Sequence, residues 1–446
     1  MVNEGQQRKV TRRIFAKAAG AGVAAAALTT KGWHASAAPA SSSRRVTAYQ
    51  DKPFAGKTLV LSGPAYWAPH FPDVILKKFE EQTGAKTEFA QFPAGEYDVK
   101  YSSYLVAEDS SVDVLYQWEA VIGKYGPVLL EDITGKVSQP VLDDTVAAAQ
   151  AAVMWQGKQY GVPFDSNMAI FLWNTDLYTA AGLDPATPPQ NWTEFLEFST
   201  KLTSGDTYGT MIPPEFFHYA VMINSTGGPA LSPDLKTVLA DTPESQLALQ
   251  SMSDLFASGA NDPISLTVPN SIEQGKNFRA GRFGHYFGFP NHFNLAQDPT
   301  QSQVVGKVAH GIIPGISLRS GTGNGVEGCA INRFSKQKDM ALAFLEFTMS
   351  ADIQDYIGVT WGRPPASITA LDNPEVLAAS PQFESVKEQA QYTATRYGSP
   401  FYDDLNKLYT EEMLKMANGD QNAADTATAI QPKAQQIVDD YWASVE

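Results

Sequence analysis

The chain has 446 residues, of which 43% are hydrophobic and 18% charged, a composition typical of folded proteins rather than disordered or fibrous ones. Its 33 Lys and Arg residues against 48 Asp and Glu residues give a net charge of −15, which argues against binding to nucleic-acid phosphates. The single cysteine, Cys329, excludes an internal disulfide, a paired-cysteine redox motif and a cysteine-rich zinc site.

The first forty residues have the features of an export signal. The pair Arg12-Arg13 precedes a short run rich in Ala and Gly, and small residues typical of a cleavage site follow. We predict a twin-arginine signal peptide over 1–40, cleaved near Ala37–Ala40, and a flexible leader over 41–56; the alternative for the first segment is a disordered basic tail. No cysteine lies near the cleavage point, so we expect no lipid anchor and a periplasmic mature protein.

Beyond the leader, short apolar runs alternate with stretches of helical spacing. Strands are predicted over 57–63, 87–92 and 112–116, with helices over 72–82 and 97–107 between them. This order of strands and helices implies an α/β fold built on a parallel sheet with helices on both faces.

The later part of the chain also carries signals for strands and helices. Residues 156–164 are predicted as a tight turn and a strand. Asn191 and Glu194 have the spacing of a capping box, which predicts a helix starting there. Ser335 is predicted to cap a further helix, and 423–442 has helical spacing.

Two of the predicted strands end in aromatic residues. Tyr66 and Trp67 follow the first strand, and Trp118 with Glu119 follows the third. Ligands of α/β sheets collect at the carboxyl ends of strands, so these positions are candidates for a binding site. The competing interpretation is that the two tryptophans belong to the core.

Signals for catalysis and metal binding are weak. There is no HExxH pair and no GxSxG elbow. The run over 323–328 satisfies GxGxxG, but it leads into a predicted strand, whereas a dinucleotide site needs a strand followed by a helix. We therefore predict no catalytic residue, no metal and no cofactor. A glycosidase needs two carboxylates across a cleft, and Glu119, Asp165 and Glu327 leave that alternative open.

Several sequence blocks resemble the extracellular solute-binding proteins, family 1, of ABC importers, the carbohydrate receptors similar to maltose-binding protein. The most specific blocks are Tyr-Gly-Val-Pro-Phe at 160–164, Leu-Trp-Asn-Thr-Asp-Leu at 172–177, Ala-Gly-Leu-Asp-Pro at 181–185 and Asn-Trp-Thr-Glu-Phe at 191–195. Further blocks lie at 278–282, 330–345 and 362–366. The resemblance as a whole extends from about residue 57 to the C-terminus.

The resemblance implies a periplasmic binding protein-like fold of type II, with two α/β lobes that close on a ligand in the cleft between them. The chain would cross between the lobes near Asp165–Asn167, Val326–Cys329 and Trp361–Arg363. Lobe one would then comprise 57–165 plus 328–361, and lobe two 167–326 plus 363–446. The implied protein is a monomeric receptor rather than an enzyme, and its partners are a sugar and a membrane permease.

Two departures from the family pattern lie near the expected ligand. Phe283-Gly284 stands where the family often has Ala-Met, and Val326-Glu327-Gly328 stands where it usually has a pair of glycines. Sugar contacts therefore cannot be transferred by position.

A sugar presents apolar faces and a rim of hydroxyls, so its site needs aromatic rings together with carboxylates, amides or guanidinium groups. The candidates are residues of these types at strand ends, at crossings and in two aromatic segments. They are Tyr66, Trp67, Glu119, Asp165, Asn167, Phe287, Phe289, His292, Glu327, Trp361, Arg363 and Tyr402, with Tyr397 as a weaker candidate. A polyamine or a glycerol phosphate ester is the alternative ligand, although Arg363 alone is thin support for a phosphate.

Overall fold

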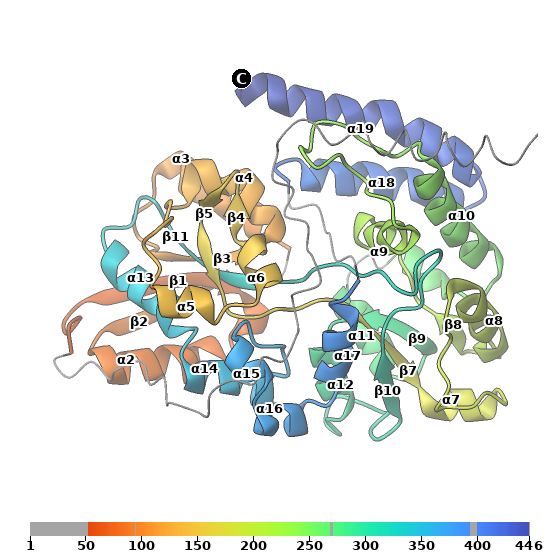
Figure 1. The fold of residues 1–446 in the computed structure, drawn as a ribbon, viewed down its shortest axis with the longest axis horizontal. Helices are drawn as coiled ribbons and strands as arrows, with labels where there is room; N and C mark the ends of the chain where they lie inside the picture. The colour runs from red at the N-terminus through yellow and green to blue at the C-terminus, as the bar shows by residue number, and fades with distance from the viewer. Residues whose placement is uncertain (1–51, 94, 268–270, 393–398, 446) are drawn as a thin grey trace, which may run out of the picture. The chain divides into compact units, whose positions relative to one another are not determined.

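The computed structural model describes residues 52–445 except 94, 268–270 and 393–398. The predicted signal peptide, most of the predicted leader and Tyr397 lie outside the described residues. The described residues belong to one compact unit that contains two larger sheets, each with its own helices (Figure 1).

The first sheet has five strands. In spatial order they are β2 (Lys86–Phe92), β1 (Thr58–Pro64), β3 (Val114–Trp118), β11 (Glu327–Ile331) and β6 (Gly161–Pro163). β1 pairs in parallel with β2 and β3, whereas β11 runs antiparallel to β3 and β6. The predicted parallel start of the sheet is present, and β11, from a distant part of the chain, enters it in the opposite direction.

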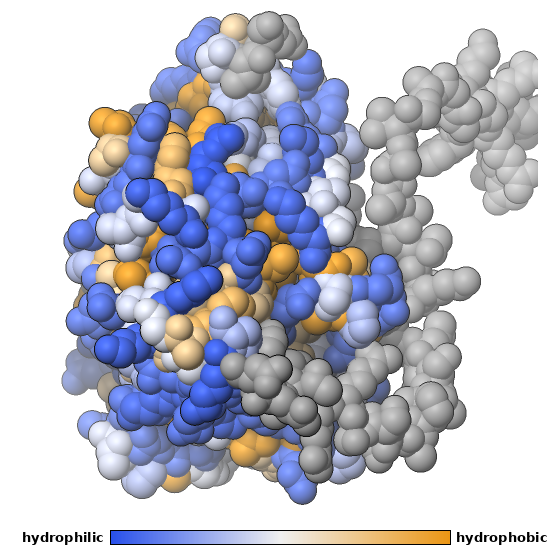
Figure 2. Space-filling view, turned by 90° about the vertical axis from the view of Figure 1, so that its left-hand side faces the viewer, coloured by the Kyte–Doolittle hydropathy of each residue, from blue (hydrophilic) through white to orange (hydrophobic). Residues whose placement is uncertain are grey.

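Helices pack around this sheet. They are α2 (Lys77–Thr83), α3 (Tyr97–Ala107), α4 (Glu119–Leu129), α5 (Gln139–Asp143), α6 (Ala147–Ala152), α13 (Lys338–Phe347), α14 (Ala351–Tyr356) and α15 (Ile368–Leu371). A small hairpin, β4 (Met154–Trp155) and β5 (Lys158–Gln159), provides the predicted turn before β6. The helix predicted over 72–82 begins as a π-helix, Phe71–Leu76, before α2. The side of the molecule at the left of Figure 1 is mostly hydrophilic, with hydrophobic residues in small groups (Figure 2).

The second sheet has four strands. In spatial order they are β10 (Val308–Gly311), β7 (Ile170–Asn174), β9 (Phe283–Gly288) and β8 (Tyr208–Thr210). Its helices are α7 (Thr175–Ala180), α8 (Trp192–Leu202), α9 (Phe216–Thr226), α10 (Pro243–Ala257), α11 (Ser271–Arg279), α12 (Asn291–Ala296), α16 (Pro374–Ala379), α17 (Phe383–Gln389), α18 (Tyr402–Ala417) and α19 (Ala423–Val445).

Local signals account for several helix starts. The Asn191 side chain accepts the Glu194 N–H at 3.0 Å and so caps α8, as predicted. Glu194 in turn accepts the N–H of Gln190, one residue before the predicted partner. The prediction that Ser335 caps α13 is wrong: the N-cap is Gln337, which has no side-chain cap bond, and Ser335 accepts the Gln337 N–H at 2.9 Å in the turn before the helix. Among the described residues, no helix is both long and apolar enough to cross a membrane.

Three segments connect the two sheets, and they lie side by side. The first follows β6 and leads into β7, the second follows β10 and leads into β11, and the third follows α14. Asp165 pairs with Pro365, and Met168 pairs with Asn324, as isolated antiparallel bridges between these segments. Main-chain hydrogen bonds from Ser166 to Pro364 and from Gly325 to Asn167, both 2.8 Å, join them further. We refer to these three stretches below as the crossing segments.

Candidate functional site

The predicted strand-end residues meet at one edge of the first sheet. β1 and β3 both end there, at Pro64 and Trp118. β11 begins at the same edge because it runs in the opposite direction, and Glu327 is paired directly with Trp118. Residues far apart in sequence are thereby brought together where the crossing segments leave the sheet.

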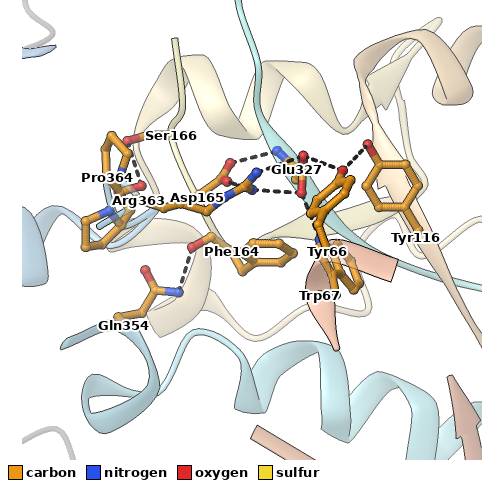
Figure 3. Close-up of polar contacts among 11 residues, drawn as sticks. Tyr66, Trp67, Tyr116, Phe164, Asp165, Ser166, Glu327, Gln354, Arg363 and Pro364 are labelled. Atoms are coloured by element: carbon orange, nitrogen blue, oxygen red, sulfur yellow. Dashed lines mark hydrogen bonds and ion pairs between the residues drawn. The ribbon is translucent and has the colours of Figure 1, made fainter. Parts of the chain in front are cut away.

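A buried ionic cluster lies at this edge. The Arg363 guanidinium lies between two carboxylates, 2.7 Å and 3.0 Å from the two oxygens of Glu327 and bonded through Nη1 to Asp165 (Figure 3). Asp165 lies in the first crossing segment and Arg363 in the third, and Glu327 is the first residue of β11, where the second crossing segment ends. The cluster therefore joins all three crossings by charged side chains.

The first sheet holds the Glu327 carboxylate from the other side. The Tyr66 hydroxyl and the Trp67 indole N–H each donate to a different oxygen of Glu327 at 2.9 Å (Figure 3). The Glu327 N–H donates to Asp165 at 2.7 Å. Each oxygen of Glu327 therefore contacts one donor that follows β1 and one guanidinium nitrogen of Arg363, which fixes the carboxylate.

Burial and charge shift the pKa values in this cluster in different directions. Burial raises the pKa of Asp165 above its ordinary value, Arg363 opposes that shift, and the charge of Glu327 adds to it. Burial alone would lower the pKa of Arg363, but the attraction of Glu327 and Asp165 outweighs it and the pKa is raised. Burial and the nearby Arg363 charge lower the pKa of His70 to about 4.

Two predicted stacking rings are covered by other side chains. Trp67 is fully buried, stacked on Phe71 with ring centroids 4.2 Å apart. Trp361 is stacked on His70 at 4.2 Å, and the Arg363 guanidinium lies 4.8 Å from its ring centroid. These rings are therefore not open platforms in this structure: Trp67 packs the core and orients Glu327, and Trp361 packs against Arg363.

The remaining aromatic candidates differ in position. Phe287 is 3% exposed and packs in the core of the second sheet against Phe195 of α8. Phe289 is half-buried and lies against Gly325 in the second crossing segment, where a Cβ atom would come within 2.3 Å of its ring. Tyr402 is buried against Trp118, with ring centroids 5.4 Å apart.

The polar candidates also divide into groups. Glu119 is half-buried at the first position of α4, beside Trp118. Asn167 is buried in the first crossing segment, and its side-chain oxygen has no hydrogen-bond partner among the described residues. His292 is buried at the start of α12, with its Nδ1 atom 3.4 Å from a guanidinium nitrogen of Arg279.

Trp118, predicted as an aromatic residue at a strand end, is half-buried and packs on the cores of both sheets. Arg279 is absent from the predicted site, because its contact with His292 joins two separate helices and no local pattern indicates it. Within the described residues, no group of three or more His, Cys, Asp or Glu side chains is arranged to hold a metal ion.

Comparisons with known proteins identify relatives across most of the chain. Residues 75–385 match the family model described as bacterial extracellular solute-binding protein. A probable amino-acid ABC transporter periplasmic-binding protein of Sinorhizobium fredii is 26% identical over 372 residues, which cover 79% of this chain and 83% of that protein.

Solved structures share the fold at lower identity. A solute-binding protein of Thermotoga lettingae bound with α-D-tagatose has a TM-score of 0.77 at 19% identity, covering 86% of this chain and 100% of that one. Maltose-bound MalE3 of T. maritima has a TM-score of 0.77 at 20% identity, covering 85% and 99%. A solute-binding protein of Agrobacterium radiobacter in complex with ribitol has a TM-score of 0.73 at 21% identity, covering 86% and 100%.

Proposed function

This chain belongs to the bacterial extracellular solute-binding proteins, and we propose that it is the receptor of an ABC importer for a sugar or polyol. The family consists of solute-binding receptors, and the predicted type II periplasmic binding protein fold is confirmed by the structural relatives. The ligand would bind in a cleft between two lobes, with the boundaries predicted above.

The observation that carries this proposal is the meeting of all three crossing segments in one buried ionic cluster. Asp165, Glu327 and Arg363 tie the segments together at the carboxyl edge of the first sheet, where ligands of α/β sheets bind. Such a junction suits a hinge, because the ionic cluster fixes the three crossing segments to one another at the point about which the lobes would rotate. A ligand that contacts both lobes shifts the population toward the closed form, which the permease would recognise.

The proposed sugar or polyol would contact the half-buried rings at this junction. Tyr66, Trp118 and Phe289 are half-buried there, and Asn167 has an acceptor oxygen to offer. Three structural relatives hold tagatose, maltose and ribitol, which supports a hydroxyl-rich ligand.

An amino acid is the second candidate ligand, because the Sinorhizobium fredii relative carries that description. A polyamine is a further alternative. A phosphate ester bound by Arg363 is less favoured, since two carboxylates already occupy that guanidinium. Glycoside hydrolysis is disfavoured for the same reason: Asp165 and Glu327 are both bonded to Arg363, so neither stands as a free proton donor.

We further propose that the chain is exported by the twin-arginine route, is cleaved near Ala37–Ala40 and acts as a periplasmic monomer. The proposal of function is tested by measuring the melting temperature of the mature protein with sugars, polyols, amino acids and polyamines. A ligand at one hundred times its dissociation constant should add about 2.7 kcal/mol of stability. If polyamines or amino acids raise the melting temperature and sugars and polyols do not, the proposed ligand class is wrong and the responding class takes its place. Release of a cleaved product from an oligosaccharide would refute the receptor role.

A further inference from the structure

The side chain of Arg279 is a buried cation at the end of α11. The residue is 8% exposed, and no Asp or Glu among the described residues forms an ion pair with it. Its Nε atom is buried without a hydrogen-bond partner among those residues. The Glu215 carboxylate lies 3.0 Å from Nδ1 of His218.

A histidine lies against this guanidinium. Nδ1 of His292 is 3.4 Å from Nη1 of Arg279, and both groups lie over Gly275, where a Cβ atom would come within 2.4 Å of the imidazole. Burial, Arg279 and Arg363 lower the pKa of His292 to about 3, so its ring is neutral at pH 7. A neutral ring that accepts at Nδ1 carries its hydrogen on Nε2, which makes it a second donor beside the guanidinium.

This pair lies at the junction between the lobes. The side chain of Asn294, on the same helix as His292, packs on Gly362 in the third crossing segment. A Cβ atom at Gly362 would lie 2.6 Å from the Asn294 side chain. Phe289, three residues before His292, lies against Gly325 in the second crossing segment. The corner between β9 and α12 is thus fixed to two of the three crossing segments that form the proposed hinge.

Two buried polar atoms have no hydrogen-bond partner among the described residues. Arg279 Nε is a donor, and the side-chain oxygen of Asn167, a residue of the first crossing segment whose main-chain carbonyl accepts from Gly325, is an acceptor. A buried guanidinium without a counter-charge is costly, whereas one that binds a carboxylate through charge-assisted hydrogen bonds is stabilised. A small carboxylate ligand with a hydroxyl or ammonium group would satisfy both sides.

We propose that Arg279 and His292 form a carboxylate subsite, so that the transported solute is a small organic acid with hydroxyl or ammonium donors, such as a sugar acid or an amino acid. This inference rests on the proposed receptor function and adds a carboxylate to the ligand that the receptor would bind. A single guanidinium that has no acidic partner among the described residues matches one negative charge better than the two charges of a phosphate ester.

The test uses matched pairs of acid and neutral probes with the mature protein. The pairs are D-glucuronate and D-glucose, D-gluconate and D-sorbitol, L-serine and L-serinamide, and glycerol phosphate and glycerol, measured by thermal shift and calorimetry. We expect the acid member of a sugar or amino-acid pair to bind at least about tenfold more tightly than its neutral partner. The pair that responds identifies the source of the carboxylate.

Variants separate a binding role from a structural one. Arg279→Gln should weaken binding of the acid probe at least about tenfold while leaving the melting temperature of the ligand-free protein unchanged or higher, because a costly buried charge is removed. Arg319→Gln is the matched control; Arg319 donates to Gln190 near the surface, and the variant should bind like the unaltered protein.

Three binding results would overturn the inference alone: neutral members binding as tightly as acids, a phosphate ester binding best, or neutral oligosaccharides binding while no acid does. It would also be overturned if Arg279→Gln lowered the ligand-free melting temperature or retained acid binding. If neither the paired probes nor neutral oligosaccharides bind, the receptor function for such solutes fails with it.

Discussion

Replacement of Arg363 by methionine would test the ionic cluster most directly. The change removes the cation that Asp165 and Glu327 both contact and keeps a side chain of similar length. Asp165 is fully buried, so its charge cannot be taken up by water without opening the structure. Removing one partner of a buried ion pair typically costs about 3–5 kcal/mol, and we expect that loss in the free energy of unfolding at pH 8.

The loss should depend on pH. Burial raises the pKa of Asp165 even with Arg363 present, and removal of Arg363 takes away the opposing effect. A carboxyl group whose folded pKa lies above its unfolded pKa favours folding when it is protonated, so stability falls as the pH rises between the two values. The deficit of Arg363→Met should therefore be smaller at pH 5 than at pH 8.

Urea denaturation of the mature protein at the two pH values, followed by tryptophan fluorescence, measures this deficit. Arg333→Met serves as the control: Arg333 is exposed and donates to the carbonyls of Pro127 and Val128, so its loss should cost no more than about 1 kcal/mol. Adding Asp165→Asn to Arg363→Met should restore part of the stability. A deficit at pH 8 no larger than that of the control, or one independent of pH, would refute the reasoning.

Three further results are expected from equilibrium unfolding. Burial opposes ionisation of Glu412, but hydrogen bonds from lysines outweigh it and lower the pKa of its carboxyl to about 2. The stability that this carboxylate contributes should be full above the unfolded pKa near 4.5 and be lost as the pH falls toward 2. Glu412→Gln should therefore show a shallower loss of stability in acid. Gly362→Ala should destabilise more than Gly419→Ala, because both glycines have positive φ but only the first would also clash, 2.6 Å from Asn294; equal losses would refute a role for the contact. Trp67→Ala should lower the free energy of unfolding by about 3–5 kcal/mol, and a loss below about 1 kcal/mol would contradict its place in the core.

The order of the elements could be predicted from sequence because the signals that set it are local. The alternation of strands and helices before residue 120 and the cap of α8 by Asn191 depend on neighbours within a few residues. The helix predicted over 97–107 has the observed bounds, whereas the ends of other elements differ by a residue or two, as with the π-helical start of the helix at Phe71. The family resemblance then supplied the three crossings, which no local pattern indicates.

The role of each candidate side chain depended on contacts between distant residues. The sequence predicted Trp67 and Trp361 as rings that stack on a ligand. Whether a ring is open or covered depends on its partners, which are Phe71 for Trp67 and His70 for Trp361. His70 is almost three hundred residues from Trp361 in the chain. Phe287 had the same composition signal and packs in the core, because its strand turns it toward α8.

Sequence alone thus determined the elements, their order and the residue types gathered at strand ends, since these follow from periodicity and capping over a few positions. Only the tertiary structure decided that Glu327 would be held by Tyr66, Trp67 and Arg363, and that Arg279 would have no acidic partner among the described residues. The physical reason is that a charge is satisfied by whichever group packing brings within about 3 Å, and that choice is made across the whole chain rather than along it.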